Sequence, residues 1–369
     1  MSQPEYSSER FSERSASRVR VLHMVKGLGL GGTEKVMQLL ACHLDRERFE
    51  IAVHCPVDGP RAVQVRQSGI TTYVAMDLSR ALSHFRPHVV HMHRAGWSEP
   101  DFLRPLRDYA PRLVVETNVF GRHDDSPSGR VIDTHLFVSH FCAERFSRLT
   151  GIKAVWPSYG VLYNPVDTEF FAGALPLGAN TQQPVLGRVS RADPGKWSSL
   201  ALDILPELAR TVPDFRYKVI GGIPQAEAFV RQHGLTECVE FCPPVATDAE
   251  LADFYGGLQV FAHANDTGES FGLVIAEAMA CGLPVVTHPA IEERDNAQLE
   301  LVEHGVTGFV ANNAEEYAHA VRWLFEHPEQ ARAMGQAGRE KARRLFRAQN
   351  IAARLGSIYL ELLELKGYR

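Results

Sequence analysis

The chain of 369 residues is too long for one ordinary hydrophobic core, and it predicts two domains of about 150–180 residues each. Its composition, 45% apolar and 22% charged, is that of a folded globular protein and excludes wholesale disorder. A net charge of −5 argues against a dedicated nucleic-acid binder, because such proteins usually carry a strong positive field.

The first 17 residues are polar and rich in Ser, Glu and Arg, which predicts a disordered tail that lacks the apolar stretch of a secretory signal. No run of 18 apolar residues occurs, so we expect no membrane-spanning helix. The six cysteines are widely spaced without a C-x-x-C pair, which favours free thiols in a reducing compartment. We therefore expect a cytoplasmic protein, and peripheral contact with the inner face of a membrane is compatible with the sequence.

Short β-branched segments alternate with helical patterns from Val19 onward, which predicts mainly parallel sheets covered by helices on both faces. The strands expected in the first half are 18–25, 50–54, 88–91, 113–116 and 134–138, with an amphipathic helix at 33–44. Those expected in the second half are 185–189, 216–220, 239–241, 260–262 and 285–287, followed by a long amphipathic helical stretch at 332–365.

This alternation predicts two doubly wound domains with a cleft between them. The segment between the two series of strands is short, free of aromatic residues and rich in Gly, Pro and polar residues, as is typical of a linker. The expected parts are a disordered tail (1–17), an N-terminal Rossmann-like domain (18–172), a linker (173–184), a C-terminal Rossmann-like domain (185–345) and a final helix (346–369) that could pack back on the N-terminal domain.

A glycine-rich turn, Gly27-Leu-Gly-Leu-Gly-Gly32, follows the first expected strand. Glycines at this place let the backbone approach a phosphate at the positive end of the next helix. A nicotinamide-dependent dehydrogenase would also need an acidic residue at the end of the second strand, which here ends in His54-Cys55-Pro56. We therefore interpret the turn as a loop that positions some phosphate, with a tight turn that binds no ligand as the alternative.

The most informative stretch, GESFGLVIAEAMACGLPVVT, spans residues 268–287. Glu269 and Glu277 are eight residues apart, just over two helical turns, so both could face one cleft. Free backbone amides at the helix start would form a diphosphate site, and Gly272 would allow close approach of the ligand. Glutamates at this spacing also occur on solvated helix faces, but Glu277 lies among apolar residues, where an unpartnered carboxylate would be costly.

This stretch resembles the E-x7-E motif of the retaining GT-B glycosyltransferases, specifically glycosyltransferase family 4. The resemblance extends from Val19 to about residue 350. Its other landmarks are Gly31-Gly32-Thr-Glu, Val89-Val-His91-Met-His93, Tyr163-Asn-Pro-Val-Asp167, Gly187-Arg188, Lys196, Val219-Ile-Gly-Gly222 and Glu300-Leu-Val-Glu-His-Gly305. The implied fold class is α/β, namely GT-B, with two doubly wound Rossmann-like domains facing each other across a cleft. The resemblance implies that the N-terminal domain binds the acceptor and the C-terminal domain binds the nucleotide sugar.

The resemblance also implies a role for each motif. Glu277 would hold the ribose of the donor nucleotide, and Glu269 would hold the hydroxyls of the transferred sugar and take part in catalysis. The implied donor-binding backbone consists of Gly31, Gly32, Ser270, Phe271, Gly272 and Leu273.

Arg188 and Lys196 resemble the family's cationic pair at the donor diphosphate. Preorganised cations stabilise the charge on a departing nucleoside diphosphate more in the transition state than in the ground state, so no metal or other cofactor is required. The loop between these residues is longer than usual in the family, so Arg191 competes with Arg188 for this role. Ordinary loop cations are the alternative interpretation.

Histidines at positions 84, 88, 91 and 93 raise the question of a zinc site. Zinc is disfavoured, because His91 and His93 share one strand face, His88 points the other way, and no cysteine or carboxylate motif lies nearby. The resemblance implies that His93 is a catalytic residue at the cleft edge; a strand-end histidine satisfied by its neighbours is the alternative. A loop containing Asp295 would also lie at the cleft rim, where we expect it to be solvated.

The resemblance implies a retaining hexosyltransferase that moves a sugar from a nucleotide-diphosphate sugar to a hydroxyl acceptor. No carboxylate is a clear nucleophile, which favours front-face attack with the leaving phosphate taking the proton. Polysaccharide, lipid-linked glycan and small-metabolite acceptors are all compatible with the sequence. Cys242-Pro-Pro244 departs from the family at a segment that often helps to hold the base, so the identity of the base stays open. The donor sugar and the oligomeric state stay open as well. Alternatives are a GT-B epimerase or hydrolase of nucleotide sugars and a non-catalytic nucleotide-sugar-binding partner subunit.

Overall fold

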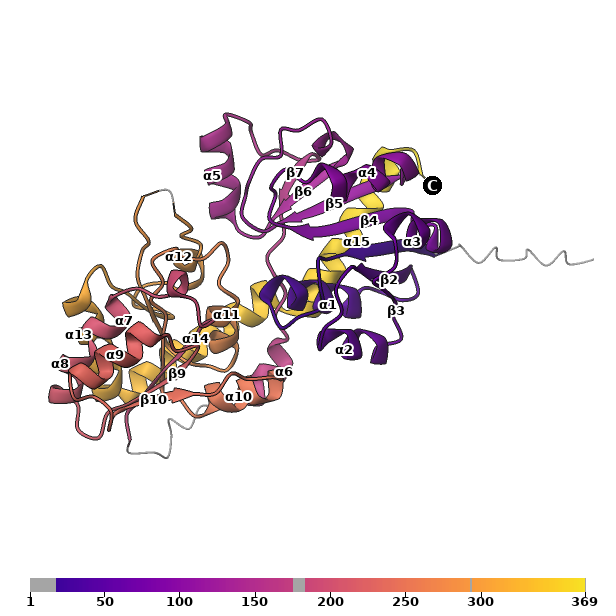
Figure 1. Cartoon of the computed structure of the whole chain (residues 1–369). Coiled ribbons are helices and arrows are strands. Elements are labelled where there is room, and N and C mark those ends of the chain that lie inside the picture. Colours follow the sequence, from indigo (N-terminus) through magenta and orange to yellow (C-terminus); the bar gives the residue numbers. More distant parts are fainter. Residues whose placement is uncertain (1–17, 175–182, 293, 369) are drawn as a thin grey trace, which may run out of the picture.

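A computed structural model describes residues 18–174, 183–292 and 294–368 and contains one parallel sheet in each half of the chain (Figure 1). The expected α/β architecture with two doubly wound sheets is confirmed. The expected disordered tail and most of the expected linker fall on residues 1–17 and 175–182, outside the described residues.

The first sheet has seven strands in the order β3-β2-β1-β4-β5-β6-β7. These strands are β1 (Val19–Met24), β2 (Phe49–Cys55), β3 (Thr71–Val74), β4 (Val89–Arg94), β5 (Leu113–Asn118), β6 (Thr134–Phe137) and β7 (Tyr159–Val161). The α-helices of this half are α1 (Gly32–His43), α2 (Arg61–Gln67), α3 (Leu78–Phe85), α4 (Pro100–Tyr109), α5 (His140–Thr150) and α6 (Thr168–Ala172). The strand order reverses between β1 and β4, and ligands of such sheets bind outside the carboxyl ends of the strands at this point.

The second sheet has six strands in the order β10-β9-β8-β11-β12-β13 and reverses between β8 and β11. Its strands are β8 (Val185–Val189), β9 (Arg216–Ile220), β10 (Val239–Cys242), β11 (Val260–Ala262), β12 (Val285–Thr287) and β13 (Gly308–Val310). The α-helices that follow β8 are α7 (Leu200–Asp203), α8 (Leu205–Thr211), α9 (Pro224–Gln232), α10 (Asp248–Gly256), α11 (Leu273–Ala280), α12 (Gln298–Leu301), α13 (Ala314–Glu326), α14 (Pro328–Phe346) and α15 (Ala348–Leu365).

The expected strands match the structure best in the interior of each sheet. Strands β8, β9, β11 and β12 have the expected bounds, and the other expected strands differ by one to three residues at their ends. The sequence analysis missed β3, β7 and β13, which are three or four residues long and lie at sheet edges. An edge strand is covered less completely than an interior one, so its apolar signal is weaker.

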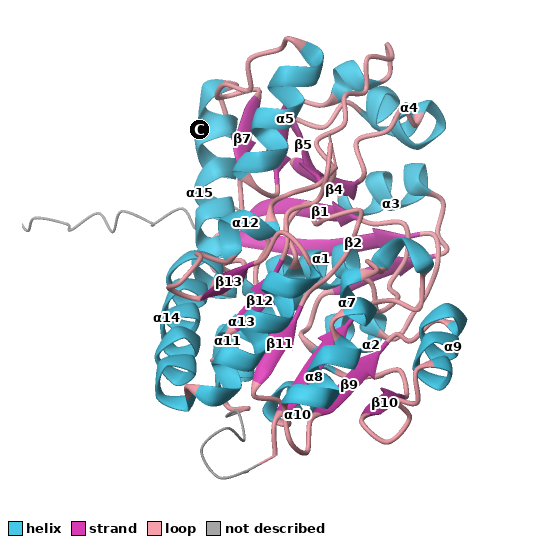
Figure 2. Cartoon of the chain, turned by 90° about the vertical axis from the view of Figure 1, so that its left-hand side faces the viewer, coloured by secondary structure: helices cyan, strands magenta, loops and turns pink. Residues whose placement is uncertain are grey.

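The expected helical stretch at 332–365 is helical in the structure, and a break at Arg347 divides it into α14 and α15. Val166 enters at the break: its amide donates to the carbonyl of Phe346 at 2.7 Å, and its carbonyl accepts from Ala348 at 2.9 Å. Beyond the break, α15 returns to the first half and packs on α1 in the same hydrophobic core as β1 and β2. Figure 2 shows α14 beside the second sheet and α15 beside the first.

Among the residues that the structure describes, none of the helices combines the length and the apolar character needed to cross a bilayer.

Candidate active site

A cavity of about 830 Å³ lies between the two halves of the molecule. The structure brings together around it all the residues to which the sequence analysis assigned a role: Gly31, Gly32, His93, Arg188, Lys196, Glu269, Ser270, Phe271, Gly272, Leu273 and Glu277. Arg191 lines it as well. These residues come from both halves of the molecule, so the two halves together form the wall of the cavity.

Two helices from opposite halves begin at this cavity. Helix α11 begins after Gly272, whose φ of 99° lies in the left-handed region that favours glycine. Helix α1 begins after Gly31, and a Cβ on Gly32 would lie only 3.0 Å from Cδ1 of Leu273, so the two helix starts pack closely. First-turn amides lack partners within their own helix, and the helix dipole is positive at this end. The cavity is therefore suited to an anionic group such as a diphosphate.

The Glu269 carboxylate is held by several donors in front of α11. Lys196 Nζ lies 3.1 Å from Oε1, Asn265 Nδ2 donates to Oε1 at 2.8 Å, and His263 Nε2 lies 3.4 Å away. Burial alone would raise the pKa of Glu269, but the hydrogen bond with His263 and the Lys196 ammonium lower it to about 2. The group is therefore a fixed anion at neutral pH, able to accept hydrogen bonds from hydroxyl groups.

We expect the affinity for a nucleotide sugar to be independent of pH from about pH 6 to 8, within the range where an ordinary histidine titrates. The lowered pKa keeps Glu269 ionised throughout this range. Burial lowers the pKa of His263 and holds that of His93 well below its usual value, so both rings stay neutral. Calorimetric titration with a panel of nucleoside-diphosphate sugars across this range checks the prediction. A change in affinity with a midpoint near pH 6.5 would contradict it.

Arg188 is a buried cation with backbone partners. Its Nη1 donates to the carbonyl of Ala264 at 2.7 Å, Nη2 donates to the carbonyl of Lys196, and the guanidinium stacks on Trp197 at 4.3 Å from the ring centroid. Within the described part of the chain, no carboxylate pairs with it, and its Nε has no hydrogen-bond partner. Burial lowers the pKa of Arg188, as expected for an uncompensated charge. An anionic ligand would supply the missing compensation.

Lys196 ends a short 3₁₀ turn that is tied to the loop before Glu269. Thr267 Oγ1 donates to the Gly195 carbonyl at 3.0 Å, which holds the turn at the cavity wall. Arg191 is exposed on the same loop, whereas Arg188 is 2% exposed and fixed by carbonyls. Both arginines face the cavity, and only Arg188 is preorganised.

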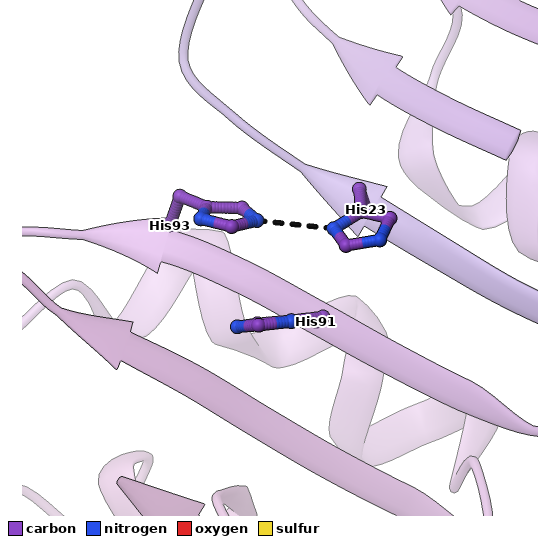
Figure 3. Close-up of side chains that lie close together, drawn as sticks. All are labelled: His23, His91 and His93. Atoms are coloured by element: carbon purple, nitrogen blue, oxygen red, sulfur yellow. Dashed lines mark hydrogen bonds between the residues drawn. The ribbon is translucent and has the colours of Figure 1, made fainter. Parts of the chain in front are cut away.

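His93 is part of a buried histidine cluster that also contains His91 and His23 (Figure 3). His93 Nε2 lies 3.0 Å from His23 Nδ1, and burial lowers the pKa of His23 to about 3, so the pair is neutral and shares one hydrogen bond. The sequence analysis missed His23. The feature that could have revealed His23 is the parallel pairing of β1 with β4, because this pairing places His23 opposite His91.

The three rings fit a metal ion poorly. His91 is already engaged through both nitrogens, by Tyr359 Oη at 2.5 Å and Thr117 Oγ1 at 2.8 Å. Its ring is stacked on that of His93, with centroids 4.5 Å apart and planes 21° apart, so their in-plane lone pairs do not converge on one point. The cluster is better described as a hydrogen-bonded support for His93 at the cavity wall.

Glu277 has a partner that the sequence did not reveal. Lys35 Nζ, from α1, lies 2.5 Å from Glu277 Oε1 and 2.9 Å from Asp248 Oδ1. Tyr255 Oη donates to Glu277 Oε2 at 3.3 Å. The apolar surroundings of Glu277 indicated that it needed a partner, but Lys35 lies 242 residues away in the sequence.

A second set of contacts joins the halves beside α5. Arg145 Nη1 lies 2.5 Å from Asp295 Oδ1, so the expectation of a solvated loop at Asp295 is wrong. Glu300 accepts from the amides of His140 and Phe141 at the first turn of α5, where a negative charge is favourable. These contacts tie α5 of the first half to the second half of the molecule.

Comparisons with known proteins identify relatives of the chain. The profile of the family described as "Glycosyl transferases group 1" matches residues 176–341. A GDP-mannose-dependent alpha-(1-6)-phosphatidylinositol monomannoside mannosyltransferase of Mycolicibacterium smegmatis is 31% identical over 288 residues, which cover 73% of this chain and 68% of that protein. A D-inositol 3-phosphate glycosyltransferase of Segniliparus rotundus is 26% identical over 317 residues, 77% of this chain and 68% of that protein.

Solved structures show the same fold. Anabaena HepE, in complex with UDP and glucose, superimposes with a TM-score of 0.74 at 20% identity over 93% of this chain and 100% of that chain. Sucrose-phosphate synthase from Thermosynechococcus elongatus gives a TM-score of 0.72 at 17% identity over 94% and 100%. These neighbours confirm the expected arrangement of two facing Rossmann-like sheets.

Proposed function

The chain belongs to the group 1 glycosyltransferases, retaining GT-B enzymes that use nucleotide sugars, and we propose that its donor is GDP-mannose and its acceptor a phosphorylated inositol. The observation that carries the donor site is the meeting of two helix N-termini with Arg188 and Lys196 around one cavity. The named base and sugar rest on the mannosyltransferase that is 31% identical. Inositol phosphate is the chemistry shared by the acceptor names of the two curated relatives.

In the proposed complex, Glu277 binds the ribose, and the amides that follow Glu269 bind the diphosphate. Glu269 accepts hydrogen bonds from hydroxyls of the transferred sugar, and His93 lies at the opposite wall, near the acceptor. Arg188 and Lys196 stabilise the charge that develops as the nucleoside diphosphate departs. The acceptor attacks from the same face, its proton passes to the leaving phosphate, and the configuration at the anomeric carbon is retained.

The acceptor side of the proposed site carries exposed aromatic side chains. Trp97 is 51% exposed in the loop after β4, and Phe120, in the loop after β5, is 38% exposed and lines the cavity. The Trp97 carbonyl accepts from buried Arg94 at 2.6 Å, and the Arg122 guanidinium lies 5.0 Å from the Trp97 ring centroid. Trp97 is not among the residues that line the cavity, so we propose that the acceptor extends from Phe120 to this ring, because an aromatic ring beside a cation suits a polyol ring that carries a phosphate.

Trp97→Ala is expected to raise the KM for the acceptor roughly fivefold to tenfold, because it removes the stacking surface. Hydrolysis of donor in the absence of acceptor should stay unchanged. Steady-state kinetics with inositol 1-phosphate checks this. The matched control is Trp156→Ala, which removes a 38% exposed tryptophan that bonds Glu361 on α15. An equal rise in both variants would show that Trp97 has no special place at the acceptor.

The experiment for the proposed function combines two donors with three acceptors. Purified protein is incubated with GDP-mannose or UDP-glucose and with inositol, inositol 1-phosphate, or vesicles that contain phosphatidylinositol, and transfer is followed by mass spectrometry. We expect mannose transfer to a phosphorylated inositol. The reaction with vesicles distinguishes a lipid acceptor from a soluble one. With a lipid acceptor, the enzyme would work at a membrane surface. Transfer from UDP-glucose alone would overturn the donor, and equal use of free inositol would overturn the acceptor.

The same assay tests the alternative functions. Consumption of the donor at the same rate without any acceptor would indicate a hydrolase or epimerase. Nucleotide binding without turnover on any acceptor would indicate a non-catalytic subunit.

A further inference from the structure

Four charged side chains form a cluster that joins the two halves at the nucleotide end of the cavity. Lys35 of α1 and Arg61 of α2 come from the first half, and Asp248 of α10 and Glu277 of α11 come from the second. Lys35 Nζ contacts both carboxylates, and Arg61 Nη1 lies 3.7 Å from Asp248 Oδ2. We call these four residues the interdomain charge cluster.

The cluster is balanced in charge, and three of its four side chains are buried, whereas the Asp248 side chain is 30% exposed. The side chains of Lys35 and Glu277 are 7% and 3% exposed, and the Arg61 side chain is 5% exposed. Burial alone would lower the pKa of Lys35, but the charges of Glu277 and Asp248 raise it, so Lys35 is a cation. Two cations face two anions, which compensates charges that would be costly in isolation. Removing one cation leaves a buried carboxylate without its partner.

The orientation of Glu277 therefore depends on both halves. Lys35, from the opposite half, holds Oε1 at 2.5 Å, whereas the Tyr255 hydroxyl, from its own half, divides its one proton between Oε2 at 3.3 Å and the Val274 carbonyl at 3.1 Å. Lys35 also lies over the Phe171 ring, 4.8 Å from its centroid, which limits the places its ammonium can occupy. A carboxylate fixed at both oxygens presents its remaining lone pairs in set directions, as recognition of a diol requires.

We propose that Lys35 is a positioning residue for the donor: it orients Glu277 toward the ribose hydroxyls, so that ribose recognition requires the two halves to be together. This inference rests on the proposed binding of the donor ribose by Glu277. Lys35 acts through Glu277, so its loss weakens the contribution of the ribose hydroxyls more than that of the base or the diphosphate.

The test compares a nucleotide with its analogue that lacks the ribose hydroxyls. Whichever of GDP and UDP the wild-type protein binds more tightly is titrated calorimetrically, together with its 2′,3′-dideoxy form. The wild-type protein should prefer the hydroxylated nucleotide by roughly tenfold or more, because hydrogen bonds to a charged group are strong. In Lys35→Met this ratio should fall to within about threefold, because the misoriented carboxylate no longer forms those bonds.

Two further variants keep the test independent of folding. Lys35→Gln retains hydrogen-bond donors without the charge, so it should fold even if Lys35→Met does not. Its neutral amide ends one bond short of the lysine ammonium and cannot hold Glu277 Oε1 as Lys35 does, so this variant should also reduce the ratio. Lys26→Met is the control, because Lys26 is 59% exposed and pairs with Glu99 at the surface, and it should leave the ratio unchanged.

The outcomes separate this inference from the proposed function. A folded Lys35→Gln protein that keeps the wild-type ratio overturns the role of Lys35 while leaving the donor site intact. A wild-type protein that binds neither nucleotide overturns the proposed function itself, and the role of Lys35 with it.

Discussion

Glu269→Ala should lower kcat/KM for sugar transfer by about 10²–10³-fold, the effect of removing one preorganised polar group from a transition-state site. The Glu269 carboxylate is ionised and aimed by Lys196, Asn265 and His263, so it can anchor the sugar hydroxyls while the anomeric carbon reacts. Its loss should disturb the orientation of the sugar more than the binding of the nucleotide. Steady-state kinetics and titration with GDP measure the two effects separately.

The same substitution should leave the affinity for GDP within about threefold of wild type, because it removes an anion and releases the Lys196 ammonium toward the diphosphate. Glu269→Gln should fall between Ala and wild type, since the amide keeps one acceptor oxygen. Glu240→Ala removes a glutamate whose side chain is 63% exposed and serves as the matched control. Wild-type turnover in Glu269→Ala would refute the assignment of this residue.

Lys196→Met should lower kcat by about 10²-fold, because the ammonium stabilises the charge that grows on the leaving diphosphate. Lys196 is fixed by its turn and by Glu269, and it is 24% exposed, so its removal leaves the fold intact. The binding of GDP should weaken less than kcat falls, since the charge is needed most in the transition state. Pre-steady-state measurement of sugar transfer gives this difference directly.

The control for this variant is Lys218→Met, on strand β9, whose side chain is 38% exposed and pairs with Glu240. An equal loss in kcat and in GDP affinity for Lys196→Met would show that the lysine binds ground state and transition state alike. In that case Arg188 or Arg191 would have to supply the catalytic charge.

Local patterns brought out much of the cavity wall that we propose to bind the donor, because several of its parts are contiguous in sequence. Glu269 to Glu277 form one loop and one helix start, and the chain geometry alone brings their amides and carboxylates to one place. The sheet interiors could also be predicted, because strands such as β11 and β12 are buried and appear as runs of β-branched and apolar residues.

Contacts between distant segments could not be predicted in this way. In the sequence, nothing distinguishes Lys35 from other residues of an amphipathic helix. It becomes the partner of Glu277 only because α1 approaches α11 in the folded chain. Likewise, Asp295 reads as a solvated loop residue until α5 brings Arg145 to it. The break at Arg347 depends on Val166, which bonds to both sides of it from far away in the chain.

The central claim is that this cavity transfers a hexose from a nucleotide sugar with retention, and the configuration of the product tests it most directly. Product formed from GDP-mannose and a phosphorylated inositol is examined by NMR, where the one-bond coupling at the anomeric carbon distinguishes α from β. We expect an α-linked mannoside, because retention keeps the anomeric configuration of the donor. A β-linked product would contradict it, because it would require attack from the far face of the sugar.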